Sequence, residues 1–338
     1  MTGMMLVFDR RRCKPQRFPI QIEVAVRALV FTGINQMELL DVDEPVPSSD
    51  EVLVSVESVG VCGSELHGIS GGSWRQPPLV MGHEIAGVDP DGRRVVINPL
   101  SACGSCDSCE RGQTNLCRKR VLLGVQRPGG FAEYVAAPRA GLHVLPEEVG
   151  WEAAALIEPL ANAVHATRLA GDLSGARVAV IGAGALGLLC TAVVATQSPS
   201  WITVADLSIP RLAVAKSVGA SSTTGRLDGE YDVVIDAVGV QASRTDSLDR
   251  LRPGGTTVWL GLAHAEATLH GNAVVREEKR VTGSFAYTNA EFAEAIRLAA
   301  LTDLTFATSV ALEDSAQVFL DLVAGRSDIV RAVIRPQA

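Results

Sequence analysis

The chain has 338 residues, 47% of them hydrophobic and 20% charged, and 30 Lys and Arg against 38 Asp and Glu give a formal net charge of −8. This composition excludes a disordered chain, and the acidic excess without a basic stripe argues against a nucleic-acid partner. No run reaches the roughly 18 apolar residues of a membrane span, so we expect no membrane association.

Residues 1–25 are predicted to be an appendage to the folded protein. They are irregular and rich in Arg, Pro and Gln, which favours an overextended gene start or a flexible arm over a functional segment. Their apolar run MMLVF precedes the basic RRRCK, the reverse of a secretory signal. We therefore expect a cytoplasmic protein whose cysteines are reduced.

An irregular β domain is predicted from Val26 to about Asn162. Short apolar runs alternate with turns throughout this stretch, as in EVLVSVESVG, RRVVINPL and GGFAEYVAAP. This rhythm is typical of short strands joined by glycine-rich turns.

An α/β domain with a parallel sheet is predicted next. ARVAVIGAG, WITVAD, YDVVIDAV, TTVWLGL and RVTGSF have the composition of buried strands, and ALGLLCTAVVATQ and IPRLAVAKSVGA between them have helical spacing. Strands that alternate with helices form a parallel sheet. The last fifty residues contain a further helix, AEFAEAIRLAA, and end in the strand-like DIVRAVIRP.

A dinucleotide-binding turn is predicted at Gly182, Gly184 and Gly187, which form GxGxxG between a strand and a helix. Glycines there allow backbone N–H groups to approach a pyrophosphate at the helix N-terminus. Asp206 ends the next strand, where a carboxylate accepts both ribose hydroxyls and repels a 2′-phosphate, so NAD is favoured over NADP. Arg211 would soften this preference. The alternative is a glycine turn that serves packing alone.

A structural zinc site is predicted at Cys103, Cys106, Cys109 and Cys117, spaced CxxCxxCx7C. Four thiolates fill a zinc tetrahedron and leave no open position. An iron–sulfur cluster is the chemical competitor, and disulfides between such close neighbours would be strained. A reactive thiol pair is disfavoured because we interpret the loop as acidic, without the cations that lower a thiol pKa.

A second set of metal ligands lies outside this cluster. VCGSELH supplies Cys62, Ser64, Glu65 and His67, MGHEIAG supplies His83 and Glu84, and IEPLANAVHA supplies Glu158. One thiolate, one imidazole and one or two carboxylates make an open zinc site with room for substrate. Taken singly, His83 is more commonly interpreted as an ordinary packed histidine and Cys62 as an inert buried thiol than as metal ligands. Pro159 predicts that Glu158 is not helical, which would let its side chain turn inward.

The chain resembles the zinc-dependent medium-chain dehydrogenases/reductases, in the branch of threonine, polyol and butanediol dehydrogenases. The motifs that carry the resemblance are CGSELH, GHE, the four-cysteine lobe, IEPLANAVHA, GAGALG, VADLSIPR and GSFAYTNAEF. It implies a GroES-like catalytic domain over 26–161 with the zinc lobe at 103–117, a Rossmann NAD-binding domain over 162–288, and a return to the catalytic domain over 289–338. It also implies a homodimer or homotetramer built through the Rossmann sheets.

The resemblance further assigns roles to matching residues. Cys62, His83 and either Glu84 or Glu158 would hold a catalytic zinc that binds an alcohol oxygen. Ser64 would take the hydroxyl proton and pass it through the NAD ribose to His67, and Glu65 would orient the ligands. Leu186 and Leu262 join Gly182, Gly184, Gly187, Asp206 and Arg211 as cofactor-binding residues.

The implied reaction is hydride transfer between NAD(H) and a secondary alcohol, vicinal diol or polyol, or its ketone. Sorbitol dehydrogenases have Arg where this chain has Ala286, which argues against a hexitol substrate. Two other hypotheses are a zinc-free quinone or enoyl reductase of the same fold and a non-catalytic NAD-binding zinc protein. The number of bound zinc ions per chain distinguishes the three hypotheses. Two ions indicate the dehydrogenase, none the zinc-free reductase, and one the non-catalytic NAD-binding protein.

Overall fold

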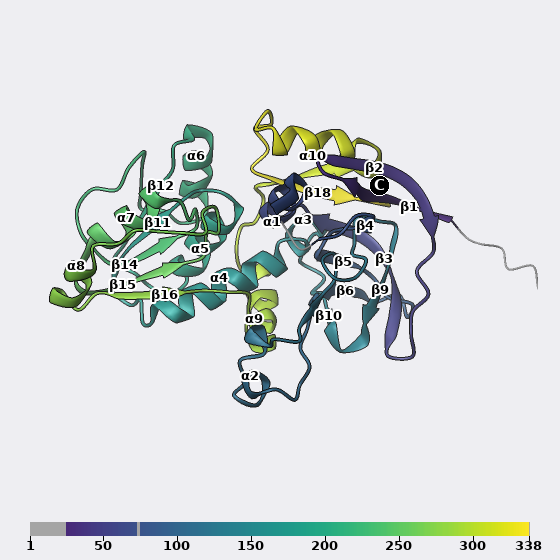
Figure 1. Cartoon of the computed structure of the whole chain (residues 1–338), viewed down its shortest axis with the longest axis horizontal. Coiled ribbons are helices and arrows are strands. Elements are labelled where there is room, and N and C mark those ends of the chain that lie inside the picture. The colour runs from purple at the N-terminus through teal and green to yellow at the C-terminus, as the bar shows by residue number, and fades with distance from the viewer. Residues whose placement is uncertain (1–24, 73–74, 338) are drawn as a thin grey trace, which may run out of the picture.

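The computed structural model describes residues 25–72 and 75–337, which build two parts around separate sheets (Figure 1). The predicted appendage lies outside the described residues, apart from Ala25. One part holds a mixed sheet and the other a parallel sheet, and helix α4 (Ile157–Ala170) runs between them (Figure 1). Among the described residues no helix is both long enough and apolar enough to cross a membrane.

The first part is built around a seven-stranded sheet of order β10-β6-β5-β3-β18-β17, with β9 also pairing with β3. Its strands are β3 (Glu51–Gly60), β5 (Glu84–Val88), β6 (Arg94–Ile97), β9 (Tyr134–Pro138), β10 (Leu142–Val144), β17 (Ala307–Ala311) and β18 (Arg331–Arg335). Two smaller sheets consist of β1 (Ala25–Gly33), β2 (Gln36–Asp43) and β4 (Leu79–Val80), and of β7 (Leu100–Ser101) and β8 (Val121–Leu122).

The C-terminal strands complete the mixed sheet. β17 and β18 are parallel to each other, and β18 pairs antiparallel with β3 through Val333–Gly60 and Ile334–Val59. Val54, Ile85, Ile97 and Ile334 are among the buried side chains that share one core here. The C-terminal strands therefore share a sheet and a core with β3 and β5.

The second part is a six-stranded, all-parallel sheet of order β13-β12-β11-β14-β15-β16. Its strands are β11 (Arg177–Ile181), β12 (Trp201–Ala205), β13 (Ser222–Thr224), β14 (Tyr231–Asp236), β15 (Leu251–Trp259) and β16 (Arg280–Gly283). This is the 3-2-1-4-5-6 order of a dinucleotide-binding sheet, which opens a crevice between its first and fourth strands. The predicted GroES-like and Rossmann fold is confirmed.

Helices cover both faces of the parallel sheet. Val178 and Val233 pack in one core with α4 and α5, and Ala179 and Val234 pack in another with Leu248 of α7. The α-helices of the described residues are α1 (Gly63–His67), α2 (Asp107–Glu110), α3 (Trp151–Ala154), α4, α5 (Ala185–Ala195), α6 (Ile209–Ser217), α7 (Gln241–Asp249), α8 (Gly271–Arg276), α9 (Asn289–Ala299) and α10 (Ser315–Val323).

Glu158 is helical, so the prediction from Pro159 was wrong. Both residues lie in the first turn of α4, where proline is tolerated because its missing N–H would have no intrahelical acceptor. The boundary that we placed after residue 161 also falls inside α4, whose Leu160, Ala161 and Val164 belong to one continuous core.

Candidate active site

Cys62 is fixed by the start of a short helix that follows β3. It is the N-cap of α1, and its Sγ accepts a hydrogen bond of 3.5 Å from the Ser64 N–H. The Glu65 carboxylate closes the capping box by accepting the Cys62 N–H at 2.9 Å. The CGSE sequence thus places the Cys62 thiol after the end of β3 and holds the buried Glu65 carboxylate next to it.

Glu65 also orients the imidazole of His83. Its Oε1 lies 2.9 Å from Nδ1 of His83 and accepts the Gly82 N–H at 2.8 Å. A carboxylate at Nδ1 keeps the proton on that nitrogen and leaves Nε2 free to bind a metal. This geometry supports the orienting role expected for Glu65.

The side chains of Cys62, His83 and Glu84 converge. One ligand atom of each lies within 4.8 Å of the others. Both Glu84 oxygens are buried, and beyond an ion pair with the buried Arg331 they have no hydrogen-bond partner among the described residues. Thiolate, imidazole and carboxylate are three ligand types of zinc, so this donor set fits the metal.

Glu158 lies beside these three residues. Its Oε1 accepts a hydrogen bond of 2.9 Å from the Tyr287 hydroxyl and one of 3.3 Å from the Asn162 amide. Burial raises the pKa of Glu158 to about 7; the positive charge of His83 opposes this rise and the Cys62 thiolate adds to it. Both predicted carboxylates are therefore at the site, Glu84 within the cluster and Glu158 next to it.

The charges of the site favour ligand binding by Cys62. Burial alone would raise its thiol pKa, but the charge and hydrogen bond of His83, with Arg331, lower that pKa to about 6. Burial lowers the pKa of His83, but the negative charges of Glu65 and Cys62 and their hydrogen bonds outweigh burial and raise it. A metal ion that binds here must therefore displace a proton from the imidazole.

Ser64 and His67 lie on the exposed side of α1. The Ser64 hydroxyl is 3.3 Å from the Cys62 sulfur, and the buried Arg75 donates to that hydroxyl at 3.3 Å and to the Ser64 carbonyl at 3.0 Å. The sequence did not indicate Arg75, Arg331, Tyr287 or Asn162. Only Tyr287 and Asn162 lay within motifs that we had identified.

The four cysteines of the lobe also converge, with all sulfurs within 4.8 Å of one another. Cys106 Sγ is 3.5 Å from that of Cys109 and 3.8 Å from that of Cys117. Ligands at ~2.3 Å around a tetrahedral ion lie about 3.8 Å apart, so this spacing fits one zinc and is too long for disulfides. All six cysteines of the described part of the chain are free.

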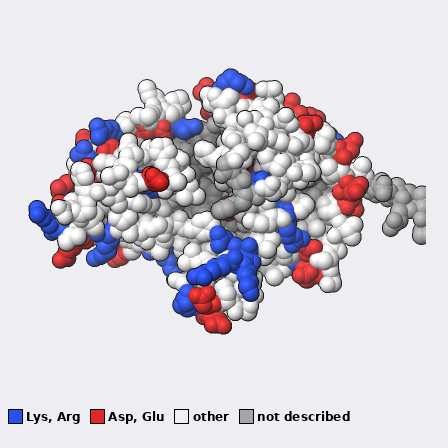
Figure 2. Space-filling view, viewed as in Figure 1, with Lys and Arg blue, Asp and Glu red and all other residues white. Residues whose placement is uncertain are grey.

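The surroundings of the lobe are basic, which corrects our interpretation of an acidic loop. Arg111, Arg118 and Lys119 are exposed and Arg120 is half-buried, and Figure 2 shows blue side chains gathered over α2 and its neighbourhood. Four thiolates around Zn²⁺ carry two excess negative charges, which nearby cations stabilise. The sequence signal, RKR directly after Cys117, was overlooked.

The predicted glycine turn follows β11. Gly182 has a φ of 95°, and a Cβ on Gly187 would lie 1.8 Å from the Gly182 carbonyl oxygen, so only glycine fits at position 187. Asp206 accepts the Ala183 N–H at 2.6 Å and the Ser208 N–H at 2.7 Å. Its carboxylate is therefore fixed at the crevice where a nucleotide ribose binds in this fold.

The other three predicted cofactor residues lie on or beside elements of the parallel-sheet part. Leu186 lies in the first turn of α5, Arg211 is exposed on α6, and Leu262 is 80% exposed after β15. Arg211 has no ion pair with Asp206 in the described structure; Asp206 precedes α6 and Arg211 lies in its first turn.

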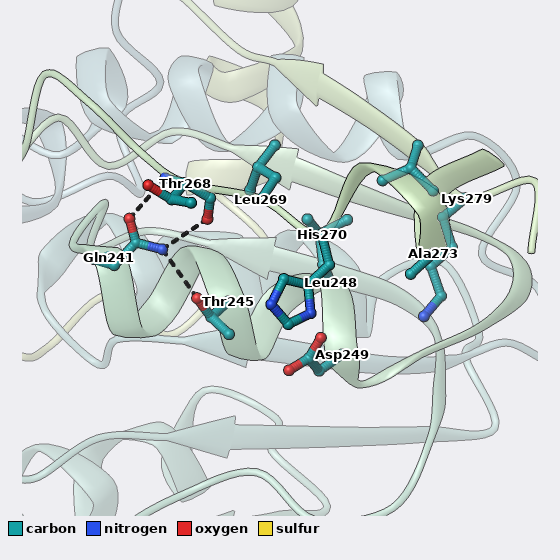
Figure 3. Close-up of a pocket in the computed structure, with 10 residues that line it drawn as sticks. Gln241, Thr245, Leu248, Asp249, Thr268, Leu269, His270, Ala273 and Lys279 are labelled. Atoms are coloured by element: carbon teal, nitrogen blue, oxygen red, sulfur yellow. Dashed lines mark hydrogen bonds between the residues drawn. The ribbon is translucent and has the colours of Figure 1, made fainter. Parts of the chain in front are cut away.

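A cavity of about 300 Å³ lies away from these groups, between α7 and α8 (Figure 3). Gln241 bridges one end, donating to the Thr268 carbonyl and accepting the Thr268 N–H, both at 2.8 Å (Figure 3). Its lining contains none of the predicted ligands or cofactor residues. This cavity is therefore separate from the predicted metal and cofactor sites.

Comparisons with known proteins agree with the fold and the two donor sets. Residues 48–147 match the alcohol dehydrogenase GroES-like domain, and residues 185–300 match the zinc-binding dehydrogenase family. D-xylulose reductase A from Aspergillus oryzae is 33% identical over 339 residues, covering 88% of this chain and 94% of that protein.

Two solved structures show the same arrangement. Acetophenone reductase from Geotrichum candidum in complex with NAD superposes with a TM-score of 0.84 at 28% identity, covering 92% of this chain and 97% of that one. 2R,3R-butanediol dehydrogenase from Bacillus subtilis has a TM-score of 0.83 at 25% identity, covering 92% of this chain and 100% of that one.

Fold, glycine turn and metal donors together define a zinc-binding oxidoreductase. This chain belongs to the zinc-dependent medium-chain dehydrogenases/reductases, in their polyol branch, and is an alcohol dehydrogenase that uses zinc and NAD. The zinc-free reductase and the non-catalytic binding protein are disfavoured accordingly.

Asp206 is expected to set the preference for NAD over NADP. In Asp206→Ser we expect the ratio of kcat/KM for NAD to that for NADP to fall at least about tenfold, since like charges 4 Å apart near a protein surface repel by up to roughly 4 kcal/mol. Steady-state kinetics with both cofactors measure this ratio. Equal use of NAD and NADP by the wild type, or an unchanged ratio in the variant, would contradict the assignment.

Proposed function

We propose that this enzyme oxidises a small secondary alcohol or vicinal diol with NAD, at a zinc ion held by Cys62, His83 and Glu84. The convergence of these three side chains carries the proposal. Helix α1, which starts beside Cys62, lies on the side of the mixed-sheet part that faces the parallel sheet (Figure 1). An alcohol bound there would meet a nicotinamide that extends from the crevice.

Zinc, when bound, lowers the pKa of a coordinated hydroxyl and so favours hydride release. Glu65 keeps the His83 imidazole in the ligating orientation through its 2.9 Å contact with Nδ1. Ser64, exposed beside Cys62, accepts the proton of the substrate hydroxyl and releases its own proton, which the exposed His67 at the end of α1 passes to solvent. We assign Glu158 to the substrate side of the site, because Tyr287 and Asn162 already hold its carboxylate.

A substrate screen tests the proposal. Secondary alcohols, vicinal diols, amino alcohols and sugar alcohols are offered with NAD, and formation of NADH is followed by its absorbance. We expect oxidation of at least one small secondary alcohol or diol. A protein that loads with zinc and binds NAD but oxidises no alcohol would contradict the proposal.

Ala286 is proposed to limit the length of the substrate. It is half-buried one residue before Tyr287, where sorbitol dehydrogenases have arginine. In Ala286→Arg we expect the kcat/KM ratio of sorbitol to 2,3-butanediol to rise about tenfold, the effect of one charge-assisted hydrogen bond of roughly 1.5 kcal/mol. Ala286→Leu adds bulk without charge and is the control.

A wild type that oxidises sorbitol or xylitol better than 2,3-butanediol would refute this role of Ala286. An equal change in Ala286→Leu and Ala286→Arg would assign the effect to bulk alone.

We also propose the domain division given by the sequence, a homodimer or homotetramer, and a cytoplasmic location. Exposed apolar side chains along β16 and α8, including Val275 and Val281, support association through the edge of the parallel sheet. Sedimentation velocity of the wild type and of Val281→Lys tests the oligomer. A wild-type monomer, or an unchanged oligomer in Val281→Lys, would contradict this interface.

A further inference from the structure

We propose that the four-cysteine lobe positions the catalytic centre. Asn115 and Arg120 hold the segment 285–287 so that Tyr287 can donate its hydrogen bond to Glu158. This inference rests on the proposed function, because it takes Glu158 to act at the substrate side of the zinc site. It assigns the lobe a role in catalysis in addition to its own folding.

Two residues of the lobe, one before and one after the metal ligand Cys117 in the sequence, contact Phe285. Asn115, buried two residues before Cys117, donates from Nδ2 to the Phe285 carbonyl at 2.8 Å. Arg120, three residues after Cys117, lies over the Phe285 ring at 4.6 Å and donates to the Cys117 carbonyl at 3.0 Å. A metal that fixes Cys117 therefore fixes both contacts to Phe285.

The segment beyond Phe285 is held in a conformation that needs support. Ala286 has a φ of 51°, in the left-handed region that a residue with a Cβ occupies only when its surroundings hold it there. Thr288 caps α9, and Glu291 accepts the Thr288 N–H at 2.8 Å. Tyr287 is thus anchored by the lobe on one side and by a helix start on the other.

Tyr287 connects this segment to the active site. Its side chain is 1% exposed, and its hydroxyl donates to Glu158 Oε1 at 2.9 Å. Because Asn162 reaches the same oxygen only at 3.3 Å, a shift of Tyr287 would change the orientation of the carboxylate.

The lobe and Glu158 are also joined through α4. The Asn115 amide lies 3.5 Å from Nε2 of His165, whose Nδ1 is 2.9 Å from Glu291. His165 follows Glu158 by about two helical turns, so both lie on one side of α4. Figure 1 shows α9 between the lobe helix α2 and α4, and α9 packs against α4.

A double-mutant cycle on the zinc-loaded enzyme tests the proposal. We expect Tyr287→Phe to lower kcat/KM about 10- to 100-fold, as is usual for partners that orient groups at a metal site. Asn115→Ala should lower it by about fivefold to tenfold, and the double variant should be no slower than Tyr287→Phe alone because both changes act through one contact. Glu110→Ala, on the outer surface of the same lobe, is the matched control and should match the wild type.

Hydrogen exchange supplies a readout that needs no turnover. In Asn115→Ala the peptide spanning residues 284–288 should exchange faster than in the wild type, with two zinc ions per chain retained, whereas Glu110→Ala should not change it. If Asn115→Ala releases zinc, Arg120→Ala takes its place, with the same expectations. Effects on kcat/KM that multiply in the double variant, or wild-type exchange at 284–288 in the lobe variant, would overturn the proposal.

The two failures are distinguishable. A wild type that oxidises no alcohol refutes the proposed function. Exchange at residues 284–288 still decides whether the lobe holds this segment.

Discussion

Cys62→Ala is expected to lower NADH-linked alcohol oxidation by more than the roughly 10- to 100-fold that follows loss of an outer partner at a metal site. The change removes the one thiolate of the Cys62, His83 and Glu84 cluster. Two remaining ligands hold a zinc ion poorly, so polarisation of the alcohol is lost with the metal. Steady-state rates on the purified variant measure the effect.

The fold and NAD binding should persist in Cys62→Ala. The thiol lies at the start of α1, whereas the glycine turn and Asp206 belong to the separate parallel sheet. Thermal unfolding and NAD titration by fluorescence are the controls. A Cys62→Ala protein with wild-type turnover would show that catalysis does not depend on this metal site.

Cys106→Ala is expected to lose stability before it loses activity. Three thiolates cannot complete the tetrahedron, and the lobe contributes few side chains to the cores: Cys117 is its buried apolar residue. Zinc supplies roughly 10 kcal/mol of folding free energy to autonomous zinc peptides, and we expect less for a lobe tethered to a folded domain. A lower unfolding temperature with one zinc ion per chain is the predicted result.

Activity of Cys106→Ala should fall only as the lobe loosens, in proportion to the loss of ordered protein and of the Asn115 contact with Phe285. Glu110→Ala, which changes a neighbouring exposed side chain that is not a predicted ligand, is the control. A Cys106→Ala protein that melts normally but is inactive would instead indicate chemistry at the four-cysteine lobe.

The parallel sheet was predictable because its signals are local. Each buried strand is a continuous apolar run, and the glycine spacing and Asp206 lie within 25 residues of Gly182. The donors Cys62 and His83 were recognisable for a similar reason, since each lies in a short motif. The same locality explains why the four lobe cysteines were found together.

The remaining features depend on contacts between distant parts of the chain. Arg331 reaches Glu84 because β18 returns to pair with β3, and no pattern near either residue indicates that ion pair. Asn115 contacts Phe285 across 170 positions. Pro159 gave a misleading local signal, because the effect of proline depends on whether it lies in the first turn of a helix or further along.

Metal content tests the central claim most directly. We predict two zinc ions per chain in the wild type and one in each of Cys62→Ala and Cys106→Ala, measured by inductively coupled plasma mass spectrometry on protein purified without chelators. Two ions in the Cys62 variant, or fewer than two in the wild type, would contradict an enzyme that combines an open zinc site at Cys62, His83 and Glu84 with a closed one in the lobe.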